Sequence, residues 1–416
     1  MFRNTCVIFI IIFFLTTIMM NAQSDNIEKL SLKSAVDAAI KNNPELELLR
    51  KEISALESVK LQNGLYPNPE FDLEAENILG QKDFSGFKGS EITAKINQSI
   101  LLAGKINKRT KIAEADITLA EWDYEVKRLT IITDVRKAFA NALSTQSLIE
   151  KNKELITISN ELISNLGKRV EAGKISPAEV SRAVIILNSL QIELNRLQSE
   201  YDISIAELKS LLFQPELSFM SLEEGMKPVT ELPAYDSLLL QLGNNPSLKR
   251  YQSEYEKQLA VINYEEAKAI PDINISAGYK RLNEAKTGTF LIGASIPLPI
   301  FNTNQGSIQE ARIRYDQKKI EKESIENKLR LSLSVLYNRF QTLLNTSIQL
   351  KNNSIPQAQE TFKIIKEGNL VGRFAILDII DAERTLFELQ NQYLSVIGEM
   401  VIVKSEIEGL IGKEIN

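Results

Sequence analysis

The sequence has no histidine and a single cysteine, Cys6, which lies near its start. Histidine and cysteine supply most zinc ligands, and both are common nucleophiles and proton-transfer groups. Their absence from the remaining chain excludes a metal site of the Cys/His type and any mechanism that needs either residue. Sites built only from carboxylates, which suit hard cations, are not excluded. We therefore predict no catalytic residues, no cofactor and no metal centre of the usual type.

Long hydrophobic runs are scarce, and the clear one lies at the start. An apolar run from Val7 to Met20 follows Arg3 and ends just before Ala22, a small residue suited to cleavage. This pattern predicts a secretory signal peptide over residues 1–22. The alternative is an uncleaved anchor, but a run of about 14 residues is shorter than the roughly 20 that cross a bilayer as a helix.

The sequence also has fewer basic than acidic residues. Without residues 1–22 the chain has 48 lysines and arginines (49 less Arg3) against 54 aspartates and glutamates, a net charge of −6. This acidic balance argues against nucleic acid as a partner. Since no later segment is apolar enough for a membrane helix, we expect an exported protein that no helix anchors.

Glycine and proline are absent from two long stretches, which predicts very long helices. Lys105 to Leu166 lacks both over 62 positions, and Ser307 to Ile355 lacks both over 49, up to Pro356, where we expect a break or kink. At 1.5 Å per residue, these helices would measure about 93 and 74 Å. Apolar residues in the first stretch recur at three- and four-residue steps, as in an amphipathic helix: Val126, Leu129, Ile132, Val135, Phe139 and Leu143. We expect returning helices at about Ala178–Phe213 and Phe374–Ile411.

The chain repeats one plan with a period of half its length. "AGKISPAEVSRAVIIL" at 172–187 matches "VGRFAILDIIDAERTL" at 371–386, with a constant offset of 199. Asn-Asn-Pro at 42–44 likewise returns at 244–246, and an asparagine before a proline predicts the start of a helix. We therefore predict a first repeat over 23–215 and a second over 216–416.

Each repeat also contains a pair of segments in which apolar and polar residues alternate, at 70–101 and at 271–299. An alternation of period two predicts strands with two different faces. Strands of about ten residues can cross a membrane when tilted, with apolar side chains toward lipid and polar ones toward water. Four of the polar residues, predicted to line such a lumen, are Asp72, Glu74, Glu76 and Lys95.

A membrane sheet must close, and the smallest membrane barrels have about eight strands, so four strands would need partners from other chains. The alternative is a small soluble sheet that packs on the helices. The fold class we predict is mainly α with a small β part.

These features together resemble the TolC family of outer-membrane efflux proteins, in particular the branch that serves heavy-metal and multidrug pumps of the RND type. The resemblance extends over nearly all of the mature chain. It is most specific in "SIPLPIFNTNQGSIQEAR" at 295–312 and in "VGRFAILDIIDAERTL" at 371–386. It implies a homotrimer in the outer membrane of a Gram-negative cell. Its twelve strands would form one β-barrel surrounded by outer-membrane lipid, and its long helical hairpins would form an α-helical barrel in the periplasm.

The resemblance also implies partners and site residues. An inner-membrane RND pump and a periplasmic adaptor protein would complete the assembly. Gly173 and Gly372 match the glycines that turn the family's helical hairpins at the tips where the adaptor docks. Asp378 and Asp381 match acids at the channel entrance, where threefold symmetry would form rings of charge that select cations. The alternative is that both carboxylates face water near the positive end of a helix dipole.

One feature of the family's entrance is missing. Some members close it with an arginine and a tyrosine, but the matching positions here are Phe374 and Asn369. Candidate gate partners are therefore Arg169 and Arg373, which could pair with Glu179 or with the two entrance aspartates.

The function we predict is a passive exit duct of a tripartite efflux pump, which conducts metal cations or drugs from the periplasm to the exterior and has no active site. The alternative is a soluble periplasmic coiled-coil scaffold or adaptor, but an adaptor would have one hairpin within a single β-rich domain. An enzyme that uses a carboxylate pair such as Glu74 and Glu76 is the third hypothesis, and no motif would position its substrate.

Overall fold

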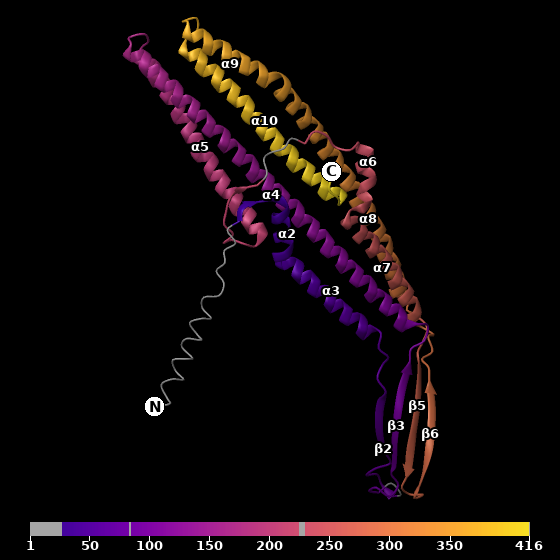
Figure 1. The fold of residues 1–416 in the computed structure, drawn as a ribbon. Helices are drawn as coiled ribbons and strands as arrows, with labels where there is room; N and C mark the ends of the chain where they lie inside the picture. The colour runs from indigo at the N-terminus through magenta and orange to yellow at the C-terminus, as the bar shows by residue number, and fades with distance from the viewer. Residues whose placement is uncertain (1–26, 83–84, 224–228, 416) are drawn as a thin grey trace, which may run out of the picture. The chain divides into compact units, whose positions relative to one another are not determined.

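The computed structural model describes residues 27–82, 85–223 and 229–415, so the predicted signal peptide at 1–22 lies outside the described residues. Figure 1 shows long helices and extended strands along the described chain. The chain forms two compact units. Unit 1 comprises Met1–Pro44, Arg128–Leu238 and Leu333–Asn416, and unit 2 comprises Glu45–Lys127 and Leu239–Ser332. Each unit takes segments from both predicted repeats, and the repeats themselves stay a prediction.

Unit 2 contains a four-stranded antiparallel sheet with the strand order β2-β3-β5-β6. Its strands are β2 (Glu70–Glu76), β3 (Glu91–Ile100), β5 (Ile273–Leu282) and β6 (Thr287–Ser295). All four lie within the segments where the alternation predicts strands, which confirms that prediction. The outer edges of β2 and β6 have no strand partner within the described chain.

The helices of unit 2 begin where the sequence indicates. They are α3 (Pro44–Asn63), α7 (Pro246–Lys268) and the first parts of α4 (Lys105–Glu171) and α8 (Gln305–Gln349). Asn245 caps α7, since its side chain accepts a hydrogen bond of 2.7 Å from the Ser247 N–H. Ion pairs then link neighbouring helices: Lys257 Nζ lies 2.5 Å from Asp116 Oδ1 between α7 and α4, and Lys318 Nζ lies 2.9 Å from Glu254 Oε1 between α8 and α7.

A largely buried ion pair joins the start of α4 to the residue before β5. Lys105 Nζ lies 2.7 Å from Asp272 Oδ1, and it also donates to the Ile270 carbonyl at 2.6 Å. The same Asp272 oxygen accepts a hydrogen bond of 2.9 Å from the Leu102 N–H. Because the Lys105 side chain is only 9% exposed, its charge depends on these partners.

Unit 1 contains two helical hairpins. The first consists of the second part of α4 and α5 (Pro177–Leu212), and the second consists of α9 (Ile355–Leu370) and α10 (Ile376–Ile411). The returning helices expected from the sequence agree with α5 and α10 to within two residues. At Pro356, where a break or kink was expected, α8 passes through one π-helical segment, η3 (Leu350–Ser354), into α9.

Several small elements were not predicted. In unit 1, β1 (Ile27–Leu30) pairs in parallel with β4 (Phe219–Leu222), and α2 (Leu32–Asn42) and α6 (Tyr235–Gln241) are short helices. In unit 2, the 3-10 helix η2 (Leu242–Asn244) precedes α7.

The core of unit 1 follows α10. Met400, Val403, Ile407 and Ile411 are fully buried there. The end of the helix is fixed by Glu408, whose Oε2 lies 2.8 Å from Arg136 Nη1 of α4 and whose Oε1 accepts a hydrogen bond of 2.9 Å from the Ile415 N–H.

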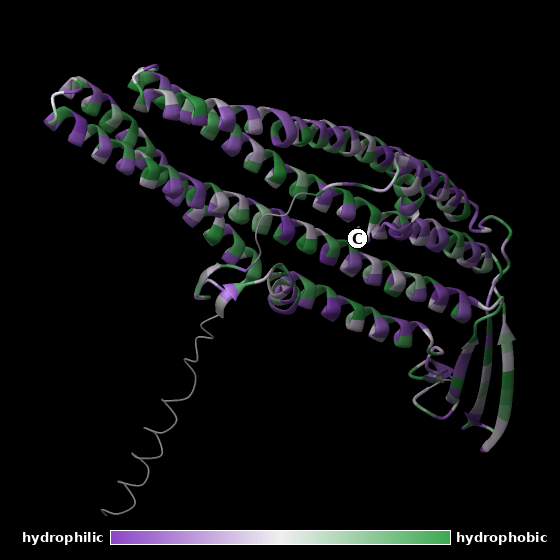
Figure 2. Cartoon of the chain, turned by 45° about the horizontal axis from the view of Figure 1, so that its top comes forward, coloured by the Kyte–Doolittle hydropathy of each residue, from purple (hydrophilic) through white to green (hydrophobic). Residues whose placement is uncertain are grey.

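Figure 2 shows hydrophobic and hydrophilic residues interspersed along the long helices. In the ranges that the structure describes, no helix is long and apolar enough to cross a membrane.

Replacement of Asp272 by alanine tests the ion pair of unit 2. We expect Asp272→Ala to lower the free energy of unfolding by about 3 kcal/mol, because Lys105 would keep a buried and uncompensated charge. Denaturant unfolding of the purified full-length protein would measure the change. Lys51→Met, which removes an exposed partner of Glu47, serves as the control with an expected change of less than about 0.5 kcal/mol. Equal effects of the two substitutions would contradict the assignment.

Candidate functional site

The first hairpin of unit 1 turns at Gly173. The Gly173 N–H donates to the Val170 carbonyl and the Lys174 N–H donates to the Arg169 carbonyl, both at 2.9 Å. This is the Schellman motif, in which one left-handed residue ends a helix. Gly173 has a φ of +66°, a conformation that glycine adopts without strain.

The second hairpin turns in the same way at Gly372, which has a φ of +76°. The Gly372 N–H donates to the Asn369 carbonyl at 3.1 Å, and the Arg373 N–H donates to the Gly368 carbonyl at 2.9 Å. Phe374 then lies against Gly368, where an added Cβ would approach its ring to 2.5 Å. A side chain at 368 would therefore displace the phenylalanine from the turn.

A hydrogen bond links the two tips within one chain. Arg169 Nη1, on α4, donates to Asn369 Oδ1, on α9, at 2.7 Å. The Asn369 amide also donates to the Phe374 carbonyl at 2.8 Å, and the residue is 5% exposed. The side chain of Asn369 is thus held by Arg169 through its oxygen and by the Phe374 carbonyl through its nitrogen.

The candidate gate partners do not pair as anticipated. In the described chain, neither Arg169 nor Arg373 forms an ion pair with Glu179 or with an entrance aspartate, whereas Glu179 lies 3.4 Å from Arg182 on its own helix.

The two predicted entrance aspartates lie in the first turns of α10 and differ in their contacts. Asp378 Oδ2 accepts a hydrogen bond of 2.7 Å from the Ala375 N–H, so this carboxylate caps the helix start. Asp381 Oδ1 lies 3.8 Å from Arg384, which also approaches Glu388 at 3.7 Å. Both aspartates are exposed.

Asp378 and Asp381 share a groove of about 400 Å³ between α9 and α10, and the other lining residues are Ala358, Thr361, Ile365, Phe374, Ala382 and Thr385. The structure therefore brings the two carboxylates to one open surface, which a cation could approach.

Glu383, on the opposite face of α10, was missed by the sequence analysis. It is 6% exposed, and its Oε1 has no hydrogen-bond partner in the described structure. Burial raises the pKa of Glu383 to about 7, against the smaller opposing effect of the positive charge on Lys366. The sequence contained one signal of this burial: Glu383 lies seven residues after Ile376, on the apolar stripe of α10.

The four predicted lumen residues share one face of the sheet in unit 2. Asp72 lies opposite Lys95 in the register of β2 and β3, and Lys95 Nζ lies 3.7 Å from both Asp72 Oδ2 and Glu74 Oε2. Glu76 pairs at 3.0 Å with Lys280 of β5, which also binds Glu91. Two lysines thus share four carboxylates on this face, which leaves an excess of negative charge.

The other face of the same sheet is apolar and exposed. Phe71 and Leu73 are each 68% exposed, while Phe290 and Ile292 are 84% and 86% exposed. Side chains this apolar are rarely left in water as a continuous band. The alternation thus separates a charged face from one suited to lipid.

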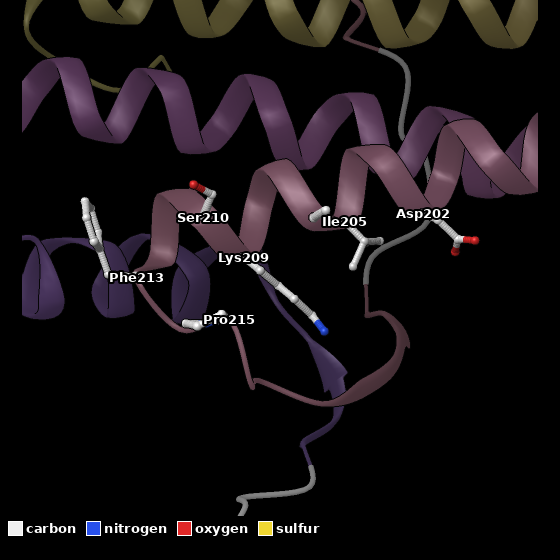
Figure 3. Close-up of a pocket in the computed structure, with 7 residues that line it drawn as sticks. Asp202, Ile205, Lys209, Ser210, Phe213 and Pro215 are labelled. Carbon is white, nitrogen blue, oxygen red and sulfur yellow. The ribbon is translucent and has the colours of Figure 1, made fainter.

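Another groove, of about 680 Å³, lies along the end of α5 in unit 1 (Figure 3). One carboxylate, Asp202, and one amine, Lys209, line it together with Ile205, Ala206, Ser210, Phe213 and Pro215. It contains none of the residues predicted from the sequence. Among the described residues, no group of three or more acidic, histidine or cysteine side chains could hold a metal ion.

Comparison with known proteins identifies the family. The family model described as "Outer membrane efflux protein" matches residues 35–212 and 239–413. The chain belongs to this family. The resemblance seen in the sequence is therefore confirmed.

Individual relatives agree with this membership. The chain is 28% identical over 386 residues to the cobalt-zinc-cadmium resistance protein CzcC of Cupriavidus metallidurans, and the match covers 92% of this chain and 90% of the relative. It is 20% identical to the outer membrane protein TolC of Escherichia coli, with 83% of this chain and 74% of TolC covered.

Solved structures show the same fold. The channel protein CusC matches with a TM-score of 0.73 at 17% identity, over 95% of each chain. The outer membrane protein VceC of Vibrio cholerae also gives 0.73, at 19% identity over 92% of this chain and 96% of VceC.

As an outer membrane efflux protein, the chain is a channel of a tripartite pump and not an enzyme. It acts in the outer membrane with an adaptor and an inner-membrane pump, which favours the duct over the soluble scaffold.

The cap at the start of α10 can be tested without any assay of transport. In Asp378→Ala, we expect the Ala375 amide to exchange its hydrogen about fivefold faster, because loss of a helix cap costs on the order of 1 kcal/mol. Hydrogen exchange of the full-length protein would measure the rate. Asp381→Ala removes a carboxylate that makes no such bond, so exchange at Ala375 should not change. Equal acceleration in both variants would show that Asp378 is not the cap.

Proposed function

We propose that three copies of this chain form one exit duct that serves an RND-type pump and exports metal cations. Each copy would supply the four strands β2, β3, β5 and β6 to a closed barrel of twelve, and its two repeats would each supply one strand pair and one hairpin. The observation that carries this proposal is the four-stranded sheet with two open edges and two chemically opposite faces. In an outer membrane, such edges need strand partners, and neighbouring copies can provide them.

In this barrel the charged face would line the lumen and the apolar face would contact outer-membrane lipid. Asp72, Glu74, Glu76 and Lys95 would then surround the water path. The ion pairs made by Lys95 and Lys280 would keep these side chains extended along the wall, and their negative excess would favour cations.

The relatives support a metal cargo. CzcC is a cobalt-zinc-cadmium resistance protein, and a nickel-cobalt-cadmium resistance protein, NccC of Alcaligenes xylosoxydans xylosoxydans, is 24% identical over 59% of this chain. Carboxylates are hard ligands that suit hydrated divalent cations in passage. A duct needs attraction and fast release, so an entrance without histidine or cysteine is compatible with transport of these metals.

We place the entrance at the hairpin tips. Asp378 and Asp381 are exposed beside one groove, and a threefold axis would repeat them as two rings. The turns at Gly173 and Gly372 would bind the adaptor, since two identical exposed Schellman turns offer it two equivalent contact points.

The hydrogen bond between Arg169 and Asn369 would be the latch that keeps the two tips of one chain together. Asn369 occupies a position where some family members use a tyrosine, and here its amide bonds to both Arg169 and the Phe374 carbonyl. Opening would then require the loss of a bond to a guanidinium, a bond stronger than one between neutral groups.

Single-channel recording in planar bilayers tests the entrance. We expect the purified full-length protein to show cation-selective openings, and Asp378→Asn/Asp381→Asn to reduce the cation-to-anion permeability ratio severalfold, because two rings of charge would be lost. Glu52→Gln/Glu57→Gln, which removes two exposed carboxylates from α3, is the control with the same change in net charge. Equal selectivity in wild type and the entrance variant would move the constriction elsewhere. A trimer without openings even in the latch variants below would contradict the duct.

The latch is tested by the fraction of time that the channel is open. Arg169→Met and Asn369→Ala should each increase the open probability. The double variant should not exceed the larger single effect, because both substitutions remove the same bond between Arg169 and Asn369. Arg196→Met, on α5, removes a guanidinium that pairs only with Glu193 and Glu200 in the described chain and should leave the open probability at the wild-type value. Additive effects of Arg169→Met and Asn369→Ala would show that the two residues act independently.

A further inference from the structure

Glu383 lies on a face of α10 that is otherwise apolar. Ile376 and Ile380 belong to a buried cluster with Leu166 of α4 and Ala183 of α5. Residue 383 follows them at helical spacing, so its side chain projects from the same stripe toward the first hairpin. The polar entrance residues of α10 project from the other side. A carboxyl group is therefore enclosed where the second hairpin packs on the first.

Among the described residues, none forms an ion pair or hydrogen bond that would compensate a charge on Glu383. Glu383 is 6% exposed, and within the described structure its Oε1 accepts no hydrogen bond and the side chain forms no ion pair. An ionised carboxylate without partners is costly to bury, whereas a neutral carboxyl costs much less. The packed arrangement of the two hairpins therefore favours the protonated form.

The charged groups around this contact do not reverse the preference of Glu383 for its protonated form. From α9, Lys366 is exposed and weakly favours the ionised form. On α4, Glu161 is exposed and Arg169 is bonded to Asn369. On α5, Glu179 and Arg182 pair with each other. On α10 itself, Arg384 lies between Asp381 and Glu388, so one net negative charge remains there, which does not favour ionisation of Glu383.

We propose that Glu383 is a proton-dependent switch of the entrance: its protonated form stabilises the packed hairpins, and its ionised form favours their separation at the tips. This inference rests on the proposed function, since separation of the tips controls passage only if the tips are the entrance. The direction follows from proton linkage. The packed state binds a proton that the separated state, with a solvated carboxylate, releases. Packing is thus fully favoured at acidic pH and weakens as the pH rises.

The pH range follows from the shift given above. An exposed glutamate titrates near pH 4.5, and the buried one near pH 7. The extra stability of the packed tips is therefore fully present below about pH 4.5 and is lost progressively as the pH rises to about 7. Above that value, the cost of a buried charge is constant, and the open form is favoured as far as Glu383 controls it.

Spin labels can measure this separation directly. Cys6 is the single cysteine and lies in the predicted signal peptide, so cysteines introduced at Ala172 and Val371, exposed residues at the two tips, would be the labelled pair. Dilution with unlabelled chain leaves one labelled copy per assembly. We expect the distance between the labels to increase from about pH 5 to about pH 9 in the full-length protein.

Variants assign the transition to Glu383. Glu383→Gln, a neutral side chain of the same shape, should keep the short distance at every pH. Lys366→Met removes the charge that favours ionisation and should move the midpoint to higher pH. Glu360→Gln removes an exposed carboxylate from α9, about three turns before its end, and should leave the transition unchanged. A wild-type transition retained in Glu383→Gln, or a midpoint unmoved by Lys366→Met, would overturn the switch.

Conductance recorded on the same samples separates the two proposals. If the channel conducts but the distance between the tips does not respond to pH, the switch is wrong and the duct stands. If the distance follows the protonation of Glu383 but the protein never conducts, the proton-dependent packing stands and the duct is wrong.

Discussion

The unpaired main-chain groups along the edges of β2 and β6 are the constraint on which the rest of this architecture depends. Within the described part of the chain, strands pair with one another at the three inner contacts of the sheet, and the outer edges of β2 and β6 have no strand partner. A protein of the outer membrane cannot leave two rows of N–H and C=O groups in hydrocarbon, where no water replaces the missing partner. In the proposed trimer, neighbouring copies would supply the missing partners, and the two faces of the sheet would determine which way it turns. The ion pair between Lys105 and Asp272 fixes the start of α4 next to the residue that precedes β5.

The two hairpin tips have the same backbone turn, but their acidic side chains make different contacts. Both end in a Schellman turn, and both return into a long helix. At the first tip, a glutamate pairs with an arginine on its own helix, and Ser176 caps the start. At the second, Asp378 is itself the cap, and so one carboxylate has both a structural and a proposed electrostatic role. The interpretation of Asp378 as a helix-start acid and its interpretation as an entrance acid are therefore compatible.

Much of the fold could be predicted from the sequence, and the reasons are local. Alternation in the segments 70–101 and 271–299 has no helical counterpart, so the four strands of the main sheet were found, and the turn glycines marked the hairpins. The pairing of β1 with β4 joins two four-residue segments far apart in the chain, and nothing in either segment alone predicts it. The position of Glu383 on the apolar stripe of α10 indicated a buried side chain, but periodicity within one helix does not show which helix covers it. The bond between Arg169 and Asn369 likewise depends on which helices face each other. Family resemblance supplied the entrance aspartates, but it could not supply Asn369, because there the chain departs from the family.

The π-helical segment η3 has a consequence for how the long helix before the second tip is organised. A π turn adds one residue to a helical turn, so the side chains beyond it are rotated by about 100° relative to an uninterrupted α-helix. The chain therefore stays helical from α8 through η3 into α9, but the side chains of α9 are rotated relative to those of α8. Within unit 1, a stripe of residues along the last part of α8 (Leu333–Gln349) is therefore not continued in line by the residues of α9. Pro356, which lacks an N–H, is the second residue of α9 after this change of phase.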